Sequence, residues 1–249
     1  MKYILEICAG SLNSALAAQE GGADRVELCD NLYEGGTTPS YGIIKTCKSL
    51  LSIPIFPIIR PRGGDFVYSD HEFEVMKQDV QCCLELGCAG IVFGILRPDG
   101  SVDIERCSEL ITLSGAMQLT FHRAFDRCCD PEKGLEEIVK MGFNRILTSG
   151  GMNYAEDAIP EISKRVKQAE NRISIMPGSG ITTGNLMTLA KDTRAFEFHS
   201  TAKRKIDAAA QSSLKTNLDS EDLHETDVIK VREMRQLLDS FNELWKNSH

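Results

Sequence analysis

Short β-forming runs alternate with longer segments of helical periodicity along the whole chain. We expect the strands at residues 3–8, 25–30, 53–61, 90–96, 117–125, 145–151, 173–180 and 195–201. Eight strand–helix units of this kind close into a (β/α)8 barrel of the TIM type. A doubly wound open sheet is the competing fold, but ICAGSLNSA after the first strand lacks the usual G-x-G-x-x-G loop. The sequence therefore predicts an α/β protein with one barrel domain.

The length of 249 residues is ordinary for one barrel, so we expect a single domain over residues 1–249. An apolar stripe places the last helix at 227–246. Between it and the eighth strand lies a polar loop at about 202–226, and loops of this length are usually functional or disordered.

The charge and the cysteines restrict the partners. A net charge of −8 argues against nucleic acid and against anionic membrane surfaces, which need a basic face. The N-terminal run MKYILEICAG is too short and too soon interrupted to be a signal peptide. Nine scattered cysteines are typical of reduced thiols rather than of a disulfide framework. We expect a cytoplasmic protein that forms a homodimer, the commonest symmetric assembly.

The charged residues of the predicted strands share one parity, which means that they lie on the same face of each strand. Glu6 alternates with Leu5 and Ile7, and the other strands repeat this pattern. Because the apolar set must pack beneath the helices, the polar set faces the barrel axis. The residues that we expect to carry acid–base chemistry there are Glu27, His122, Asp126, Glu197 and His199. The alternative is a structural layer of ion pairs that fills the barrel interior.

Arginines and glycines at the same predicted edge indicate an anionic ligand. Arg60 and Arg62 in RPRGGDF have the planar guanidinium that grips carboxylates and phosphates. Glycine turns follow strands six and seven, where many barrels bind phosphate. The residues predicted to contribute there are Ser149, Gly150, Gly151, Gly178, Ser179 and Gly180.

Cys8 and Cys29 occupy equivalent inward positions near the ends of neighbouring strands. Two thiolates within reach of one ion favour a soft metal such as Cu(I). The alternative is that both cysteines are buried as small apolar side chains. A hard divalent ion held by Glu27, Glu197 and His199 is a further possibility.

Several long motifs resemble the CutC family of copper homeostasis proteins. They are EICAGS, GGADRVELCDNLYEGGTTPS, IRPRGGDFVYSD, TFHRAFD, ILTSGG, MPGSGI and EFHSTA, followed by TDVIKVR near the C-terminus. The resemblance covers nearly all of residues 3–201. It implies a cytosolic (β/α)8-type barrel and a copper-binding role, with Cys8 and Cys29 at the positions proposed to hold Cu(I).

Two functions follow from these observations. The resemblance implies Cu(I) binding and copper homeostasis, with copper as the bound metal. The charged barrel mouth favours an enzyme, either a lyase, an isomerase or a hydrolase, acting on a small anionic and possibly phosphorylated metabolite. The expected partner is accordingly a metal ion or a small anionic ligand.

Overall fold

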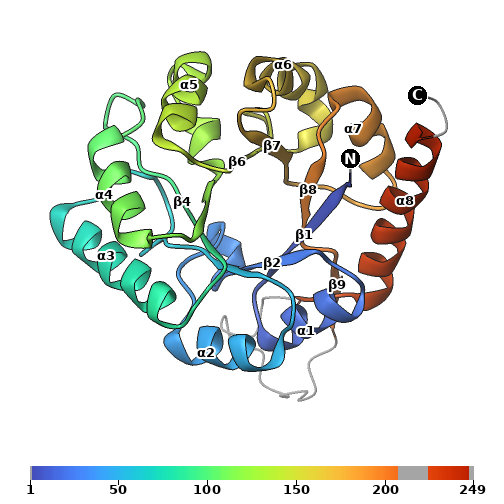
Figure 1. The fold of residues 1–249 in the computed structure, drawn as a ribbon, viewed down its shortest axis with the longest axis horizontal. Coiled ribbons are helices and arrows are strands. Elements are labelled where there is room, and N and C mark those ends of the chain that lie inside the picture. The colour runs from blue at the N-terminus through green and yellow to red at the C-terminus, as the bar shows by residue number, and fades with distance from the viewer. Residues whose placement is uncertain (1, 207–223, 247–249) are drawn as a thin grey trace, which may run out of the picture.

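A computed structural model describes residues 2–206 and 224–246. Over these residues, a ring of parallel strands is surrounded by helices (Figure 1). The strands of the ring are β1 (Ile4–Ala9), β2 (Arg25–Leu28), β3 (Ile55–Pro57), β4 (Gly90–Phe93), β5 (Gln118–Phe121), β6 (Arg145–Thr148), β7 (Ser174–Pro177) and β8 (Glu197–Ser200). The surrounding helices are α1 (Leu12–Glu20), α2 (Tyr41–Leu50), α3 (Asp70–Glu85), α4 (Ile104–Ser114), α5 (Pro131–Met141), α6 (Ile159–Ala169), α7 (Leu186–Thr193) and α8 (Val228–Lys246).

The strands are hydrogen-bonded in the orders β3-β2-β1-β8 and β4-β5-β6-β7. A parallel bridge between Ile58 and Val92 joins the β3 and β4 ends, and β7 packs beside β8 to close the ring. The predicted (β/α)8 barrel is thus confirmed. In the part of the chain that the structure describes, every helix is too short or too polar to cross a bilayer.

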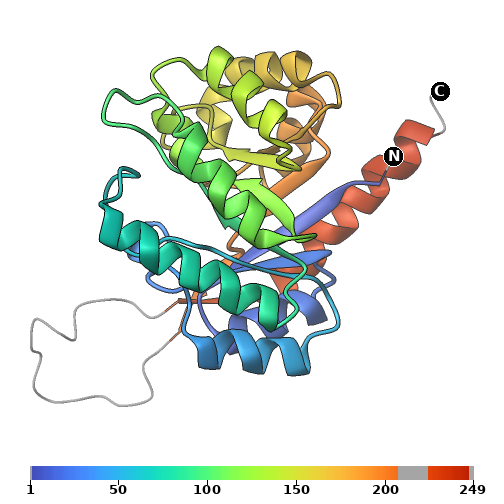
Figure 2. The ribbon, with the colours of Figure 1, turned by 60° about the vertical axis from the view of Figure 1, so that its left-hand side comes forward.

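The apolar parity of the strands packs beneath the helices as expected. Leu5, Ile7 and Val26 are fully buried, and α8 contributes Val231 and Met234 to the same core. Figure 2 shows α8 running alongside β1, so the first strand and the last helix lie together. This packing leaves the opposite parity, with its charged residues, to fill the barrel interior.

Local capping explains where the helices begin. Ser69 and Glu72 form a reciprocal capping box at the start of α3. The side chain of Asp130 caps α5, and Pro131 occupies its first turn, as the sequence indicates.

Most of the observed strands are shorter than the predicted ones, and one difference concerns the site. β5 ends at Phe121 rather than at Phe125, because His122 caps the 3-10 helix η2 (Arg123–Arg127). Asp126 therefore lies on a helical turn and not on the strand face that the alternation predicts.

The predicted loop at 202–226 also needs correction. Its two ends pair as an antiparallel hairpin of β9 (Lys203–Lys205) and β10 (His224–Thr226). Residues 207–223 of that prediction lie outside the described residues.

A layer of buried ion pairs fills the barrel interior toward the N-terminal ends of the strands. Arg25 bonds both Glu6 and Glu197, and Arg145 donates to Glu197 over 3.1 Å. Glu6 is completely buried, while Arg25 and Arg145 are 6% and 5% exposed. We call these four residues the ion-pair layer.

We expect Arg25→Met to destabilise the protein by about 3–5 kcal/mol, because it removes the cation that pairs with the fully buried Glu6 and with the part-buried Glu197. Arg232→Met is the matched control, since Arg232 forms a 3.7 Å surface pair with Glu20 and should cost less than about 1 kcal/mol. Urea unfolding measures both. Equal costs for the two variants would show that the ion-pair layer adds no special stability.

Candidate functional site

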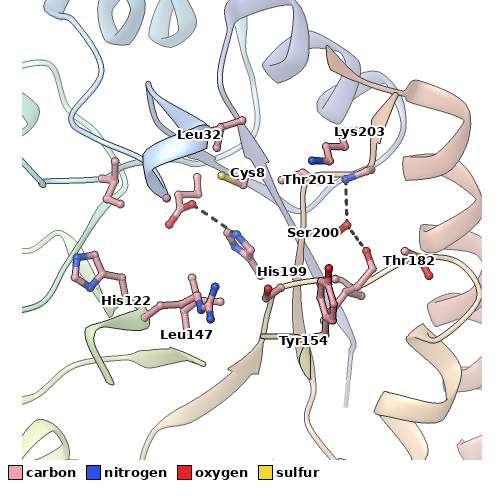
Figure 3. Close-up of a pocket in the computed structure, with 18 of the residues that line it drawn as sticks. Cys8, Leu32, His122, Leu147, Tyr154, Thr182, His199, Ser200, Thr201 and Lys203 are labelled. Atoms are coloured by element: carbon pink, nitrogen blue, oxygen red, sulfur yellow. Dashed lines mark hydrogen bonds and ion pairs between the residues drawn. The ribbon is translucent and has the colours of Figure 1, made fainter. Parts of the chain in front are cut away.

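A cavity of about 750 Å³ opens at the C-terminal ends of the strands (Figure 3). His122 lies on one side of it, while Thr182 and Lys203 lie on the other. The lining residues are Cys8, Glu27, Leu32, Gly35, Ile58, Arg60, Phe66, His122, Arg123, Leu147, Tyr154, Ser179, Gly180, Ile181, Thr182, Thr183, His199, Ser200, Thr201, Ala202, Lys203, Lys230 and Met234. Its volume is within the range of small-molecule sites.

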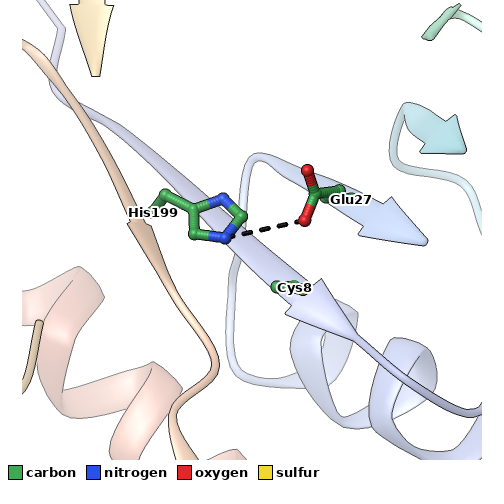
Figure 4. Close-up of side chains that lie close together, drawn as sticks. All are labelled: Cys8, Glu27 and His199. Carbon is green, nitrogen blue, oxygen red and sulfur yellow. Dashed lines mark ion pairs between the residues drawn. The ribbon is translucent and has the colours of Figure 1, made fainter. Parts of the chain in front are cut away.

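Three potential metal ligands meet on one wall of this cavity. One ligand atom each from Cys8, Glu27 and His199 lies within 4.8 Å of the others (Figure 4). Cys29 adds a second sulfur, whose Sγ atom is 3.2 Å from Sγ of Cys8. β1, β2 and β8 are neighbours in the sheet, which explains why residues far apart in sequence converge here.

Glu6 connects this wall to the ion-pair layer. Its Oε1 atom lies 2.7 Å from Nδ1 of His199, and its other oxygen bonds Arg25. This contact orients the imidazole and turns Nε2 toward Glu27, at 3.6 Å from Oε2. Carboxylates commonly orient ligating histidines in this way.

The wall holds strongly perturbed groups. Burial opposes a charge on His199, but Glu27, Cys8 and Glu6 outweigh it and hold the pKa of His199 well above its ordinary value. Burial raises the pKa of Glu27 despite the attraction of His199. The hydrogen bond with Cys29, together with burial, raises the pKa of Cys8 well above that of a free thiol. Such shifts are typical of functional sites.

Glu197 lies elsewhere than we expected. It is the first residue of β8 and belongs to the ion-pair layer, where it bonds Arg25 and Arg145. The side chain of His199, two residues further along the strand, reaches the cavity. Glu197 therefore does not reach this cavity, and the structure does not bring it together with Glu27 and His199 as the expected divalent site requires.

Asp126 and the turn after β6 satisfy one another. The carboxylate accepts hydrogen bonds from the backbone N–H groups of Ser149 and Gly151, from the Thr148 hydroxyl at 2.5 Å and from Arg123 at 2.8 Å. The anion that the turn was expected to bind is thus a side chain of the protein. Our expectation for this turn is therefore corrected. The residues that form one hydrogen-bonded unit beside the cavity are Asp126, Ser149, Gly150 and Gly151.

The two arginines of RPRGGDF lie in different surroundings. Arg62 lies outside the cavity and forms ion pairs with Glu72 and Asp65. The expected anion-binding role of Arg62 is therefore corrected, since these pairs stabilise the loop. Arg60 lines the cavity and donates to the carbonyl oxygens of Glu34, Gly36 and Gly64. It is 3% exposed.

The turn after β7 reaches the cavity only in part. Ser179 and Gly180 line it, both with positive φ. Gly178 does not line it, because it packs under Leu147 and His199, where an added Cβ atom would lie 2.4 Å from Leu147 Cδ1.

The sequence pattern did not predict several residues that are important in the structure. Arg25 and Arg145 have the same inward parity as Glu27 but stand at strand starts, where we sought no chemistry. Phe66 and Tyr154 line the cavity from loops, whose conformation the strand pattern does not predict. The inward parity of Arg25 is the sequence signal that indicates its place in the barrel interior.

The sequence pattern of the CutC family matches residues 3–204. The chain belongs to the CutC family. A CutC protein of Chromobacterium violaceum is 45% identical over 245 residues, covering 96% of this chain and 99% of that protein. The human copper homeostasis protein cutC homolog is 43% identical over 244 residues, covering 94% and 89%.

Two solved structures are similar to this chain, one of them from the same family. The CutC crystal structure from Streptococcus agalactiae has a TM-score of 0.77 and 38% identity, covering 80% of this chain and 98% of that one. Phosphoribosyl anthranilate isomerase from Thermotoga maritima has a TM-score of 0.60 at 12% identity, covering 96% and 99%. The second likeness shows the barrel fold alone.

His122 gives a test by pH. Burial and the nearby Arg60 lower its pKa to about 3, whereas the unfolded chain has about 6.5. Below pH 6.5 the unfolded state gains a proton that the folded state does not, so stability falls as the pH decreases toward 3. Between pH 7 and pH 5 we expect the wild type to lose roughly 2 kcal/mol more than His122→Phe. Urea unfolding at both pH values measures this, and equal losses would contradict a neutral His122.

Proposed function

We propose that this protein binds Cu(I) through Cys8 and Cys29 and acts in copper homeostasis. The observation that supports the proposal is the distance of 3.2 Å between Sγ of Cys8, which lines the cavity, and Sγ of Cys29, which lies behind it. Two thiolates favour a soft ion. The name of the human relative, a copper homeostasis protein homolog, agrees with this role.

The surroundings of the sulfur pair fit such an ion. His199 offers an imidazole nitrogen, which is also a copper ligand, and Glu6 holds the ring in place. Phe56, Ile58 and Val92 pack around the two cysteines and limit the access of water. Glu27 adds a carboxylate oxygen within 4.8 Å, on the side that faces the cavity.

A second candidate function is supported by the size and charge of the cavity. A volume of about 750 Å³ far exceeds the needs of one ion. The lining contains four Arg or Lys residues and, among the described residues, a single carboxylate, that of Glu27. This contrast with a net charge of −8 favours a small anionic ligand, and hence an enzyme that acts on one. Its reaction class stays a prediction.

The cellular location and the assembly also remain predictions. All nine cysteines are free, which agrees with the reducing cytoplasm. The homodimer rests on the general frequency of two-fold symmetric assemblies.

An anaerobic Cu(I) titration against a competing chelator tests the main proposal. The wild type should bind one ion tightly through the sulfur pair. Removing a group that only orients a ligand costs about 10–100-fold in affinity, so Cys8→Ser/Cys29→Ser should lose about 100-fold or more.

Cys82→Ser/Cys129→Ser is the matched control, because it also removes two thiols but neither belongs to the site. It should bind Cu(I) like the wild type. Binding that survives in Cys8→Ser/Cys29→Ser, or that falls equally in both double variants, would refute the assignment.

A further inference from the structure

Phe66 lies between two cavities and lines both of them. One is the 750 Å³ cavity described above, and the other has a volume of about 660 Å³. Both are lined by Phe66 together with Gly35, Arg60 and Arg123. The Phe66 carbonyl accepts a hydrogen bond from the backbone N–H of Leu96, which anchors the backbone at this position. The second cavity offers space for the Phe66 ring to turn.

Two buried nitrogen atoms without hydrogen-bond partners lie beside this ring. They are Nε of Arg60 and Nε2 of His122, for which the described residues provide no hydrogen-bond partner. The Arg60 guanidinium carbon is 5.0 Å from the centre of the Phe66 ring, and the two ring centres of His122 and Phe66 are 4.8 Å apart. Each of the two residues is 3% exposed. Buried donors are rarely left unpaired.

The free atom of His122 is a hydrogen-bond donor. Nδ1 accepts a hydrogen bond from the backbone N–H of Ala124 over 3.2 Å, so it carries no proton. The proton of the neutral imidazole is therefore on Nε2. The low pKa of His122 agrees with a neutral ring.

Arg60 adds a buried positive charge. Its three hydrogen bonds end on carbonyl oxygens, and its nearest side-chain partner is the uncharged hydroxyl of Tyr68. Within the described residues, no carboxylate forms an ion pair with it. A buried charge normally pairs with an opposite charge. The partner expected here is an anion from outside the chain.

Contacts between N–H groups and the face of Phe66 are the alternative explanation. Such contacts are weak, about 0.5–1 kcal/mol each, whereas an unpaired buried donor costs about 1–3 kcal/mol. The ring therefore compensates these donors incompletely, and a ligand oxygen compensates them better.

We propose that Phe66 covers an oxyanion site, in which Arg60 and His122 donate hydrogen bonds to a carboxylate or phosphate group of a small organic ligand. The ligand enters when the ring turns into the second cavity. This site goes beyond the proposed copper function, because it lies on the β3 and β5 side of the barrel and needs no metal ion. It rests on the second candidate function and specifies which residues of the cavity bind the anionic group.

Calorimetric titration with two probes, malonate and inorganic phosphate, tests the proposal. We expect saturable binding of at least one probe, and the probe that binds more tightly distinguishes a carboxylate ligand from a phosphate ligand. His122→Phe should weaken binding roughly tenfold or more, because it removes a hydrogen bond to a charged group. Phe66→Ala should strengthen binding several-fold, because no ring has to be displaced.

Matched controls are His71→Gln and Tyr41→Ala, whose side chains are exposed and line neither cavity. Both should bind the probes like the wild type. If His122→Phe does not fold, the ¹⁵N-coupled Nε2 proton signal of wild-type His122 gives the answer, since it should shift on addition of the probe. Cys8→Ser/Cys29→Ser should keep its anion affinity, which separates this site from the copper site.

The proposal is overturned if neither probe binds to the wild type or to Phe66→Ala. It is equally overturned if binding persists unchanged in His122→Phe, or if Phe66→Ala lowers the melting temperature without changing the affinity.

Discussion

The carboxylate of Glu6 is the contact on which the rest of the interior depends. It is completely buried, and its two oxygens bond Arg25 on one side and His199 on the other. Burial by itself would raise the pKa of Glu6, but Arg25 and His199 hold it well below the usual value, so the group is ionised. One buried charge thereby joins the ion-pair layer of the barrel to the wall that carries the cysteines.

This arrangement divides the inward charges into two levels along the barrel axis. At the lower level, the charges pair with each other and fill space, as the ion-pair alternative anticipates. At the upper level, Glu27 and His199 face a cavity and keep atoms that are available to a ligand. The ion-pair interpretation thus describes the lower level, while a binding or catalytic role for the upper level stays a prediction.

The sequence predicts the fold and the facing of the strands well, because both follow from periodicities of hydrophobic residues. It also brings Cys8 and Cys29 together, because both have the inward parity near the ends of neighbouring parallel strands, although the register pairs Cys8 with Glu27. Depth and partners are harder to predict. Glu197 differs from His199 by a single strand repeat, and no pattern shows that Arg145 will pair with it. The predicted position of Asp126 was wrong because the chain leaves the strand at His122. The predicted role of Arg62 was wrong because Glu72 on the following helix forms an ion pair with it.

The cavity has two chemically different walls. The wall of β1, β2 and β8 offers sulfur, imidazole and carboxylate groups, which are donors of electron pairs to a metal. The wall that follows β3 and β5 offers the guanidinium of Arg60 and the N–H group of His122, which are donors of hydrogen bonds to an anion. Because the first wall offers ligand atoms for a cation and the second offers hydrogen-bond donors for an anion, a molecule that fits both walls would carry an anionic group at one end and a metal-binding atom at the other. Ion carriage alone does not require the second wall, so the barrel mouth has the features of a site for an organic ligand as well as those of a metal site.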